Sequence, residues 1–253
     1  MSKPRIFLFD IETMPNVADI WQLRTNYVPF KMIRENDRMA MWSGKYAGES
    51  GIITMNEHEH GQESMVKGLW HHMNYADTTV GHNGDKFDIK WANRTFLEQG
   101  LAPPAPTKSV DTLKVCKQNF RFPSYALNYI CPKLGIGSKL KHTGHELWQG
   151  WEAKDPAAIK LMIKYCNQDV MLLQRLYYRI RPWIKSHAVI GLLDDKGRPT
   201  CSNCGSTKVH SRGDYTAAGY KRFQCKDCKT PLKGRRQQLS VEQRDNALTY
   251  DRG

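Results

Sequence analysis

The first hydrophobic segment of the chain, residues 5–13, has the sequence RIFLFDIET and the composition of a β-strand. Successive side chains of a strand point to opposite faces, so Ile6 and Leu8 share one face with Asp10 and Glu12. Two carboxylates on a half-buried strand raise each other's pKa unless a positive charge lies between them. We therefore expect a cation beside this pair.

Strand and helix patterns alternate along the chain after this segment. Residues 38–48 and 50–55 have the composition of two strands joined by a glycine-containing turn, which predicts a hairpin. Apolar spacing, glycines and prolines then delimit further elements. We expect helices at 61–76, 85–100 and 124–136, and short strands at 77–84 and 107–113.

The clearest helical pattern lies at residues 155–182, where apolar side chains recur at helical spacing. Asp155 is a natural N-cap, Pro156 suits the first helical position, and Pro182 ends the pattern. Because strands and helices alternate after an early hairpin, the sequence predicts an α/β domain, a mixed sheet flanked by helices. Residues 183–199 have the composition of a connector.

The net charge and the cysteine pattern indicate what kind of partner and which cellular compartment to expect. Lys and Arg outnumber Asp and Glu by 38 to 25 in the 253 residues, which gives a formal net charge of +13. Such an excess is typical of proteins with a polyanionic partner, although it also increases solubility. No run of about 18 apolar residues is present, so no membrane segment is expected. The first apolar run is too short for a signal peptide, and four of seven cysteines stand in C-x-x-C pairs. We therefore expect a reducing, cytoplasmic location.

Acidic residues from three separate segments are placed to meet at one end of the predicted sheet. Asp10 and Glu12 end the first strand, and Asp88 follows a glycine-rich turn. Tyr165 and Asp169 lie four residues apart, on one face of the long helix. Clustered carboxylates require a cation, and oxygen ligands select hard ions such as Mg²⁺ or Mn²⁺. Each motif alone is weak, since a D-x-E pair is more often a solvated strand edge, so the prediction depends on all three.

In this order, FDIET, GHNGDKFD and YCNQD resemble the three motifs of the DEDD superfamily of 3′–5′ exonucleases, in its tyrosine subclass. The second motif is similar to that of the exonuclease domain of family-B DNA polymerases. The resemblance implies an RNase H-like fold with a mixed five-stranded sheet flanked by helices. It also implies that Asp10, Glu12, Asp88 and Asp169 hold two catalytic Mg²⁺ or Mn²⁺ ions, and that Tyr165 orients the attacking water. Two such ions about 3.5–4 Å apart clamp the attacking and leaving oxygens at phosphorus.

Several polar residues near these motifs have more than one interpretation. Asn83 is expected to hydrogen-bond the turn backbone, and the resemblance also allows a contact with nucleic acid. Asp85 is interpreted as a turn residue, and Asp111 either as a strand-end residue or as a support for the acidic cluster. Whether His142 and His145 line the substrate cleft stays open. The histidines whose spacing matches no metal-ligand set are interpreted as surface residues: His58, His60, His71 and His72.

Near the C-terminus, two C-x-x-C pairs are separated by 20 residues. This spacing suits a closed, tetrahedral thiolate site for one structural Zn²⁺, and a segment of about 30 residues depends on such a metal to fold. The pattern resembles the zinc ribbons of transposase-associated proteins and transcription factors. The predicted ligands are Cys201, Cys204, Cys225 and Cys228. The other cysteines are expected to be core thiols: Cys116, Cys131 and Cys166.

Basic side chains gather beside aromatic rings in the segments YKRF and LKGRR of this small C-terminal zinc ribbon. Such groups suit phosphate contacts combined with base stacking, and docking of a protein partner is the alternative. The residues predicted to contact nucleic acid are Lys221, Arg222, Phe223, Lys233, Arg235 and Arg236. The chain is thus divided into an RNase H-like exonuclease domain at 1–195, a zinc ribbon at 196–236 and a polar tail at 237–253.

The sequence therefore predicts a metal-dependent 3′–5′ exonuclease that hydrolyses phosphodiester bonds of nucleic acid, with the ribbon assisting substrate binding. The polymerase-like second motif favours DNA over RNA. The alternatives are a structure-specific endonuclease or an RNase on the same metal core, and a non-catalytic DNA-binding or assembly factor. A complete set of four acids with a tyrosine argues against the non-catalytic alternative, because a binding module gains nothing from charges that are costly to cluster and bury.

Overall fold

The computed structural model describes residues 4–185, 187, 199–216 and 218–245. Its contacts form two compact units, and each is considered by itself. The sheet unit comprises Pro4–Ile180 with Ile184–His187, and the ribbon unit comprises Arg181–Trp183 with the described residues from 199 onward. The predicted division between residues 195 and 196 falls outside the described residues and stays a prediction. None of the described helices is long and apolar enough to cross a membrane.

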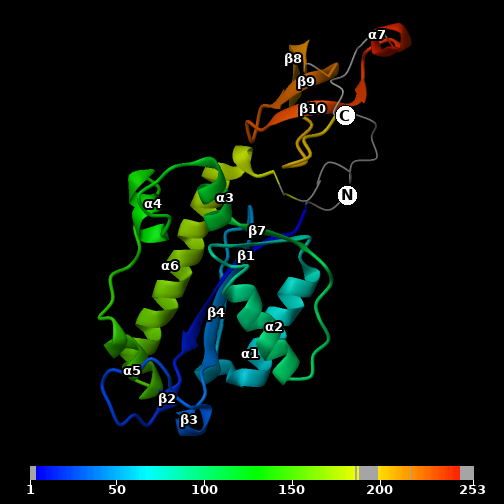
Figure 1. Ribbon diagram of the computed structural model, residues 1–253. Helices are drawn as coiled ribbons and strands as arrows, with labels where there is room; N and C mark the ends of the chain where they lie inside the picture. Colours follow the sequence, from blue (N-terminus) through cyan, green and yellow to red (C-terminus); the bar gives the residue numbers. More distant parts are fainter. Residues whose placement is uncertain (1–3, 186, 188–198, 217, 246–253) are drawn as a thin grey trace. The chain divides into compact units, whose positions relative to one another are not determined.

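The sheet unit is built on one mixed sheet of five strands in the order β5-β4-β1-β6-β7 (Figure 1). β4 pairs antiparallel with both β1 and β5, and β5 completes the predicted hairpin, whereas β6 and β7 run parallel to β1. The predicted fold class is confirmed. The strands are β1 (Ile6–Met14), β4 (Arg38–Tyr46), β5 (Ile53–Asn56), β6 (Thr78–Gly81) and β7 (Lys108–Asp111).

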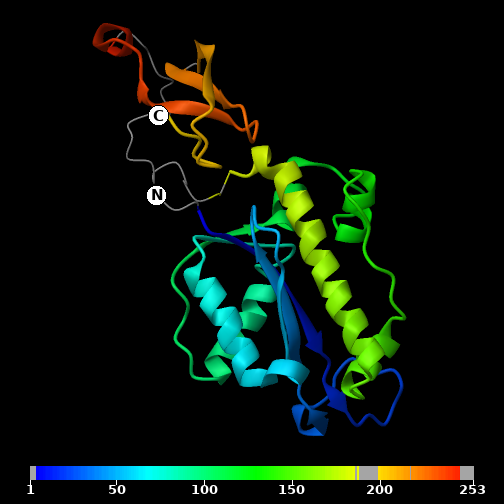
Figure 2. The ribbon, with the colours of Figure 1, turned by 180° about the vertical axis from the view of Figure 1, so that it is seen from behind.

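Helices cover both faces of this sheet, as the two opposite ribbon views show (Figures 1 and 2). α1 (Glu57–Tyr75) and α2 (Asp88–Glu98) lie on one face, and α5 (His145–Glu152) and α6 (Pro156–Ile180) lie on the other. Two short helices, α3 (Thr112–Asn119) and α4 (Leu127–Lys133), follow β7 along the chain. α3 and α5 have no counterpart among the predicted elements.

The two faces of β1 belong to two different cores. Phe7, Phe9 and Ile11 pack with α1 and α2 in one of them. On the other face of the sheet, Met162 and Cys166 of α6 belong to a second core. Asp10 and Glu12 alternate with the first set along β1 and therefore face α6, where both are half-buried.

α6 begins where the sequence predicts. The Asp155 carboxylate accepts hydrogen bonds from the backbone N–H groups of Ala157 and Ala158, both at 3.2 Å, so it caps the helix. The 25-residue helix then passes along β1 and β4. This contact places one turn of α6, residues 165–169, beside the acidic part of β1.

The connection between β1 and β4 is mostly irregular, as predicted. It contains the paired strands β2 (Val17–Ala18) and β3 (Ile33–Glu35), and the 3₁₀ turn η1 (Phe30–Met32). Four large apolar side chains in it are more than 70% exposed: Trp21, Leu23, Tyr27 and Phe30.

The interpretation of all four clustered histidines as surface residues is wrong for two of them. His72 stacks on Phe7 with ring centroids 5.4 Å apart, and its Nδ1 lies 3.1 Å from the Tyr46 hydroxyl. His58 Nε2 lies 3.0 Å from the backbone oxygen of Trp151. Both imidazoles are packing groups of the sheet unit, because helix α1 turns them towards the sheet and α5. His60 and His71 are exposed.

The ribbon unit is a three-stranded antiparallel sheet in the order β10-β9-β8. The strands are β8 (Val209–Tyr215), β9 (Tyr220–Cys225) and β10 (Pro231–Gln237). This unit also contains the turn η2 (Arg181–Trp183) and helix α7 (Val241–Asp245), which lies within the predicted polar tail. The rest of that tail, 246–253, is outside the described residues.

Candidate active site

Asp10 and Glu12 of β1 form a tight group with the thiol of Cys166 on α6. Ligand atoms of these three residues all lie within 4.8 Å of one another. The Cys166 sulfur lies 3.9 Å from Asp10 Oδ2 and 3.7 Å from the Asp10 backbone oxygen. Burial raises the pKa of this thiol well above its ordinary value, so it stays protonated and acts as a donor. The core position predicted for Cys166 is confirmed, and its thiol also contacts the acidic pair.

Asp88, the first residue of α2, reaches β1 because the preceding turn is unusually tight. Its Oδ1 accepts a hydrogen bond of 3.0 Å from the backbone N–H of Ile11, between the two acids of β1. A Cβ atom on Gly84 would lie 3.0 Å from the Cα of Gly81, closer than a side chain tolerates. Asn83 between them has a φ of 68°, a left-handed conformation that asparagine accepts better than most residues. Both glycines are therefore needed to deliver this carboxylate.

Asp169 and Tyr165 of α6 share one ammonium group. Lys139 Nζ donates to Asp169 Oδ2 at 2.5 Å and to the Tyr165 hydroxyl at 3.1 Å. The other oxygen of Asp169 is buried with no hydrogen-bond partner in the described part of the chain. The sequence analysis does not single out Lys139, because it lies in an irregular segment whose spacing relates it to none of the motifs. Its basic neighbours in KLKH are the only sequence signal.

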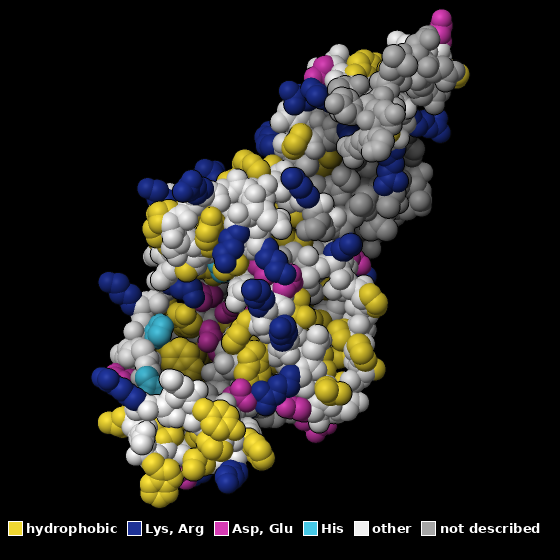
Figure 3. Space-filling view, viewed as in Figure 1, with side chains coloured by type: hydrophobic (Ala, Val, Ile, Leu, Met, Phe, Trp, Pro, Cys, Tyr) yellow, Lys and Arg dark blue, Asp and Glu magenta, His cyan; other side chains and the backbone are white. Residues whose placement is uncertain are grey.

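These groups open into a cleft of about 760 Å³ on the sheet unit. In the space-filling view, acidic side chains are visible inside a hollow that histidine and basic side chains border (Figure 3). The polar side chains that line the cleft are Asp10, His82, Asn128, Ser138, Lys139, Lys141, His142, Tyr165 and Asp169. A hollow with acids inside and cations at its edge suits a phosphate chain that is held near bound metal ions.

Burial raises the pKa of each acid in this cluster. It raises the pKa of Asp10 well above its ordinary value, and the charges of Asp88 and Glu12 raise it further. Burial and the charge of Asp169 raise the pKa of Glu12 to about 8, and burial raises that of Asp88 to about 7. The pKa of Asp169 is also raised by burial, and Lys139 offsets only part of this effect. The cluster is therefore short of positive charge.

His82, rather than Asn83, lines the cleft. Its two ring nitrogens lie 2.9 Å from the Thr112 hydroxyl and 2.9 Å from the Tyr125 backbone oxygen. Burial lowers the pKa of His82 to about 4, so the ring is neutral at physiological pH. Asn83 contributes backbone groups: its N–H donates to Asp111.

His142 and His145 differ in their position relative to the cleft. His142 lines the cleft, and its ring meets that of Tyr165 edge to face at 4.8 Å. His145 is exposed and is not among the lining residues. His142 therefore helps to hold the orientation of the Tyr165 ring.

The two further aspartates of the second motif region have structural roles. Asp85 accepts hydrogen bonds from the Ser109 hydroxyl and from Lys114, the latter at 2.7 Å. Asp111 caps α3 by accepting from the backbone N–H groups of Leu113 and Lys114. Asp111 is thus a strand-end residue, the first of its two interpretations.

The four cysteines of the C-x-x-C pairs converge in the ribbon unit. All four sulfur atoms lie within 4.8 Å of one another. The Cys201–Cys228 and Cys204–Cys225 sulfur pairs are each 3.6 Å apart. A tetrahedron with Zn–S bonds of about 2.3 Å has sulfur atoms about 3.8 Å apart, so this arrangement fits a zinc ion. The cluster predicted from the spacing is present.

The basic residues predicted to contact nucleic acid do not share one environment. Arg222 forms an ion pair of 2.9 Å with Asp214. Lys221 Nζ lies 5.8 Å from the centre of the Phe223 ring. The other three are exposed on β10: Lys233, Arg235 and Arg236.

Comparison with known proteins places this geometry in a family. The fold resembles a solved structure of the family B DNA polymerase from the hyperthermophilic archaeon Pyrobaculum calidifontis, with a TM-score of 0.55 and 17% sequence identity. The likeness covers 76% of this chain but only 26% of the polymerase, so the chain spans about a quarter of that protein. No curated protein sequence matches. A model of the RNase H superfamily (RNase_H_2) matches residues 37–181, more than half of the chain, which therefore belongs to the RNase H superfamily.

Proposed function

We propose that this protein is a metal-dependent 3′–5′ exonuclease that acts on nucleic acid, with DNA as the favoured substrate. Its superfamily and fold support a nuclease. The observation that carries the finer proposal is the convergence of four acids from β1, α2 and α6, of which Asp10 and Asp169 line an open cleft together with Tyr165. The three motifs that supply these residues resemble those of 3′–5′ exonucleases, which supports the polarity.

The acids fit two hard divalent cations, Mg²⁺ or Mn²⁺. Asp10, Glu12, Asp88 and Asp169 would hold them, because carboxylate oxygens are the ligands that these ions prefer. The raised pKa values show that the single ammonium of Lys139 does not balance the cluster. When bound, such ions supply charge stabilisation at the scissile phosphate and activate water.

Tyr165 is suited to positioning water rather than to removing its proton. Burial raises the pKa of its hydroxyl above the ordinary value near 10, so it is not an effective base at neutral pH. The hydroxyl is held by Lys139 and the ring by His142. A hydrogen-bonding group fixed in this way orients a reactant without changing its own protonation state.

The test is cleavage of 5′-end-labelled DNA and RNA strands, single and duplex, with Mg²⁺ or Mn²⁺. The proposal expects products that shorten stepwise from the 3′ end, and it expects a circular single strand to stay intact. Asp10→Asn removes one central charge and should abolish cleavage. Asp85→Asn, an acid of the same motif region that is paired with Lys114 outside the cluster, should cleave as the wild type does.

Three results would overturn the proposal. Cuts within the circular strand would indicate an endonuclease. Shortening from the 5′ end would contradict the polarity. Undiminished cleavage by Asp10→Asn with both metals would show that the acidic cluster is not the catalytic centre.

A further inference from the structure

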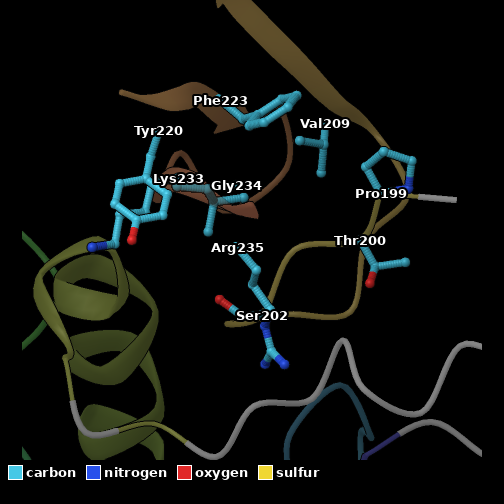
Figure 4. A pocket seen from close by; sticks show the side chains of 10 residues that line it. Pro199, Thr200, Ser202, Val209, Tyr220, Phe223, Lys233, Gly234 and Arg235 are labelled. Atoms are coloured by element: carbon cyan, nitrogen blue, oxygen red, sulfur yellow. The ribbon is translucent and has the colours of Figure 1, made fainter. Parts of the chain in front are cut away.

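The ribbon unit contains a groove of about 650 Å³ between its sheet and the segment that leads into the first C-x-x-C pair (Figure 4). β9 and β10 form one side, and residues 199–202 form the other. Its volume is within the range of about 300–1,000 Å³ that is usual for ligand-binding pockets. The lining residues are Pro199, Thr200, Ser202, Val209, Tyr220, Phe223, Leu232, Lys233, Gly234 and Arg235.

The charge of this groove favours an anionic ligand. Two of its ten lining residues are basic, Lys233 and Arg235, and none is acidic. Neither of the two forms a salt bridge with any described residue. Arg222, by contrast, is paired with Asp214 and does not line the groove. Lys233 and Arg235 are therefore available to an anionic ligand in the groove.

The groove also presents two aromatic rings from β9. Tyr220 and Phe223 both line the groove, and Figure 4 shows the Tyr220 ring beside Lys233 and the Phe223 ring apart from it. Both rings are half-buried, so each keeps part of its surface open. Lys233 Nζ lies 5.0 Å from the centre of the Tyr220 ring, within the range of a cation–π contact. A ring held beside a cation offers a stacking surface and a phosphate contact at adjacent points.

We propose that this groove binds an unpaired segment of a nucleic-acid strand, with bases stacked on Tyr220 and Phe223 and phosphates held by Lys233 and Arg235. The strand is unpaired because the faces of bases inside a duplex are already covered by their neighbours. The choice of nucleic acid over an acidic peptide rests on the proposed nuclease function and on the pairing of flat rings with cations. Compared with the sequence prediction, the groove adds Tyr220 and leaves out Lys221, Arg222 and Arg236.

Binding is measured by fluorescence polarisation with a labelled single-stranded DNA of about 20 nucleotides. The Asp10→Asn background prevents cleavage, and no chelator is added, so that zinc stays bound. Tyr220→Leu should weaken binding about tenfold, because stacking of one base is lost, whereas Tyr220→Phe should bind as the parent does. Lys233→Ala should weaken binding and lower the slope of log affinity against log salt by about one. A matched strand with abasic sites, which keeps its phosphates, should bind about tenfold more weakly than the intact strand.

Matched controls come from the same unit. Tyr215→Leu removes a ring that is 52% exposed and outside the groove, and Lys226→Ala removes an exposed lysine outside it. Both should bind as the parent does, and every variant should keep one zinc per chain, which shows that the ribbon is folded. Equal affinities for Tyr220→Leu and Tyr215→Leu would overturn the proposal. Unchanged binding of the abasic strand would overturn the stacking, and binding of poly-glutamate in place of the strand would assign the groove to a protein partner.

Failure of this proposal is distinguishable from failure of the exonuclease proposal. If the groove variants bind the long strand normally in the Asp10→Asn background, and cleave a trinucleotide at the wild-type rate when Asp10 is intact, only the groove proposal fails. If the strand binds in the groove while the wild type cleaves nothing, only the exonuclease proposal fails.

Discussion

The acidic cluster makes the stability of the metal-free protein fall as the pH rises, and Glu12 allows this to be measured. Burial and the charge of Asp169 raise its pKa in the folded state from the ordinary value of 4.5 to about 8. At pH values between these two pKa values, the folded protein holds a proton that the unfolded chain has released. The free energy of unfolding therefore falls as the pH rises through this range. The decline begins above the unfolded pKa and is complete once the pH has passed the folded one.

The expected size follows from the two pKa values. Between about pH 6.5 and about pH 8.5, this one group removes about 2 kcal/mol from the free energy of unfolding. In a domain of this size, such a change lowers the Tm by roughly 4–8 °C. His82 acts in the opposite direction: its pKa is lowered to about 4 by burial, so stability rises with pH up to its unfolded value near 6.5. The wild type alone would thus report a mixture of effects.

The assay compares wild type with Glu12→Gln by urea unfolding at both pH values, without added Mg²⁺ or Mn²⁺. Tryptophan fluorescence reports on the sheet unit, because six of the seven tryptophans lie within Pro4–Ile180. The loss of stability between the two pH values should be about 2 kcal/mol smaller in the variant, and Mg²⁺ should stabilise the wild type more at the higher pH. Equal losses in the two proteins would refute the reasoning, because they would show that Glu12 is already ionised in the folded state.

Four further perturbations separate positioning, electrostatics, packing and zinc binding. Tyr165→Phe should slow cleavage by about 10²-fold with little change in stability, since only the positioning hydroxyl is lost, and single-turnover rates measure this. Lys139→Met should slow cleavage at least tenfold. It should also lower the Mg²⁺ concentration needed for half-maximal rate, because a competing cation is removed. A higher Mg²⁺ concentration for half-maximal rate would contradict the electrostatic account. Gly84→Ala should cost about 1–3 kcal/mol in urea unfolding, because its Cβ would lie 3.0 Å from the Gly81 backbone. Cys225→Ser should release the zinc, measured by metal analysis, and weaken binding of long strands while trinucleotide cleavage persists.

The parts of the fold that follow local patterns were predictable from the sequence. Alternation along β1 fixes which face carries Asp10 and Glu12, and the Asp155 cap marks the start of α6. Cysteine spacing likewise predicts the sulfur cluster. Short helices such as α3 were missed, because their few turns leave too little periodicity to separate them from a strand end or loop.

The parts of the site that depend on tertiary placement were not predictable in the same way. Lys139 and His82 reach the cleft through irregular segments, where no period tells which way a side chain points. His72 carries the same sequence signal as an exposed histidine, and only its packing on Phe7 distinguishes it. Among the basic residues of the ribbon, Arg222 differs from Lys233 only through Asp214, a partner eight residues earlier on the neighbouring strand.

The carboxylates of the sheet unit are only partly neutralised by the groups around them. Lys139 satisfies one oxygen of Asp169, protons are retained by Glu12 and Asp88 through their raised pKa values, and one buried oxygen of Asp169 is left without a partner. A fold selected for stability alone would replace such a cluster with apolar groups, since uncompensated buried charge is costly. Its position beside an open cleft, with Asp88 held by a turn in which Gly81 and Gly84 pack closely, suits a site for divalent metal ions. If the cluster binds Mg²⁺ or Mn²⁺ as proposed, the protons held in the metal-free state leave when the metal binds, so we expect metal affinity to rise with pH.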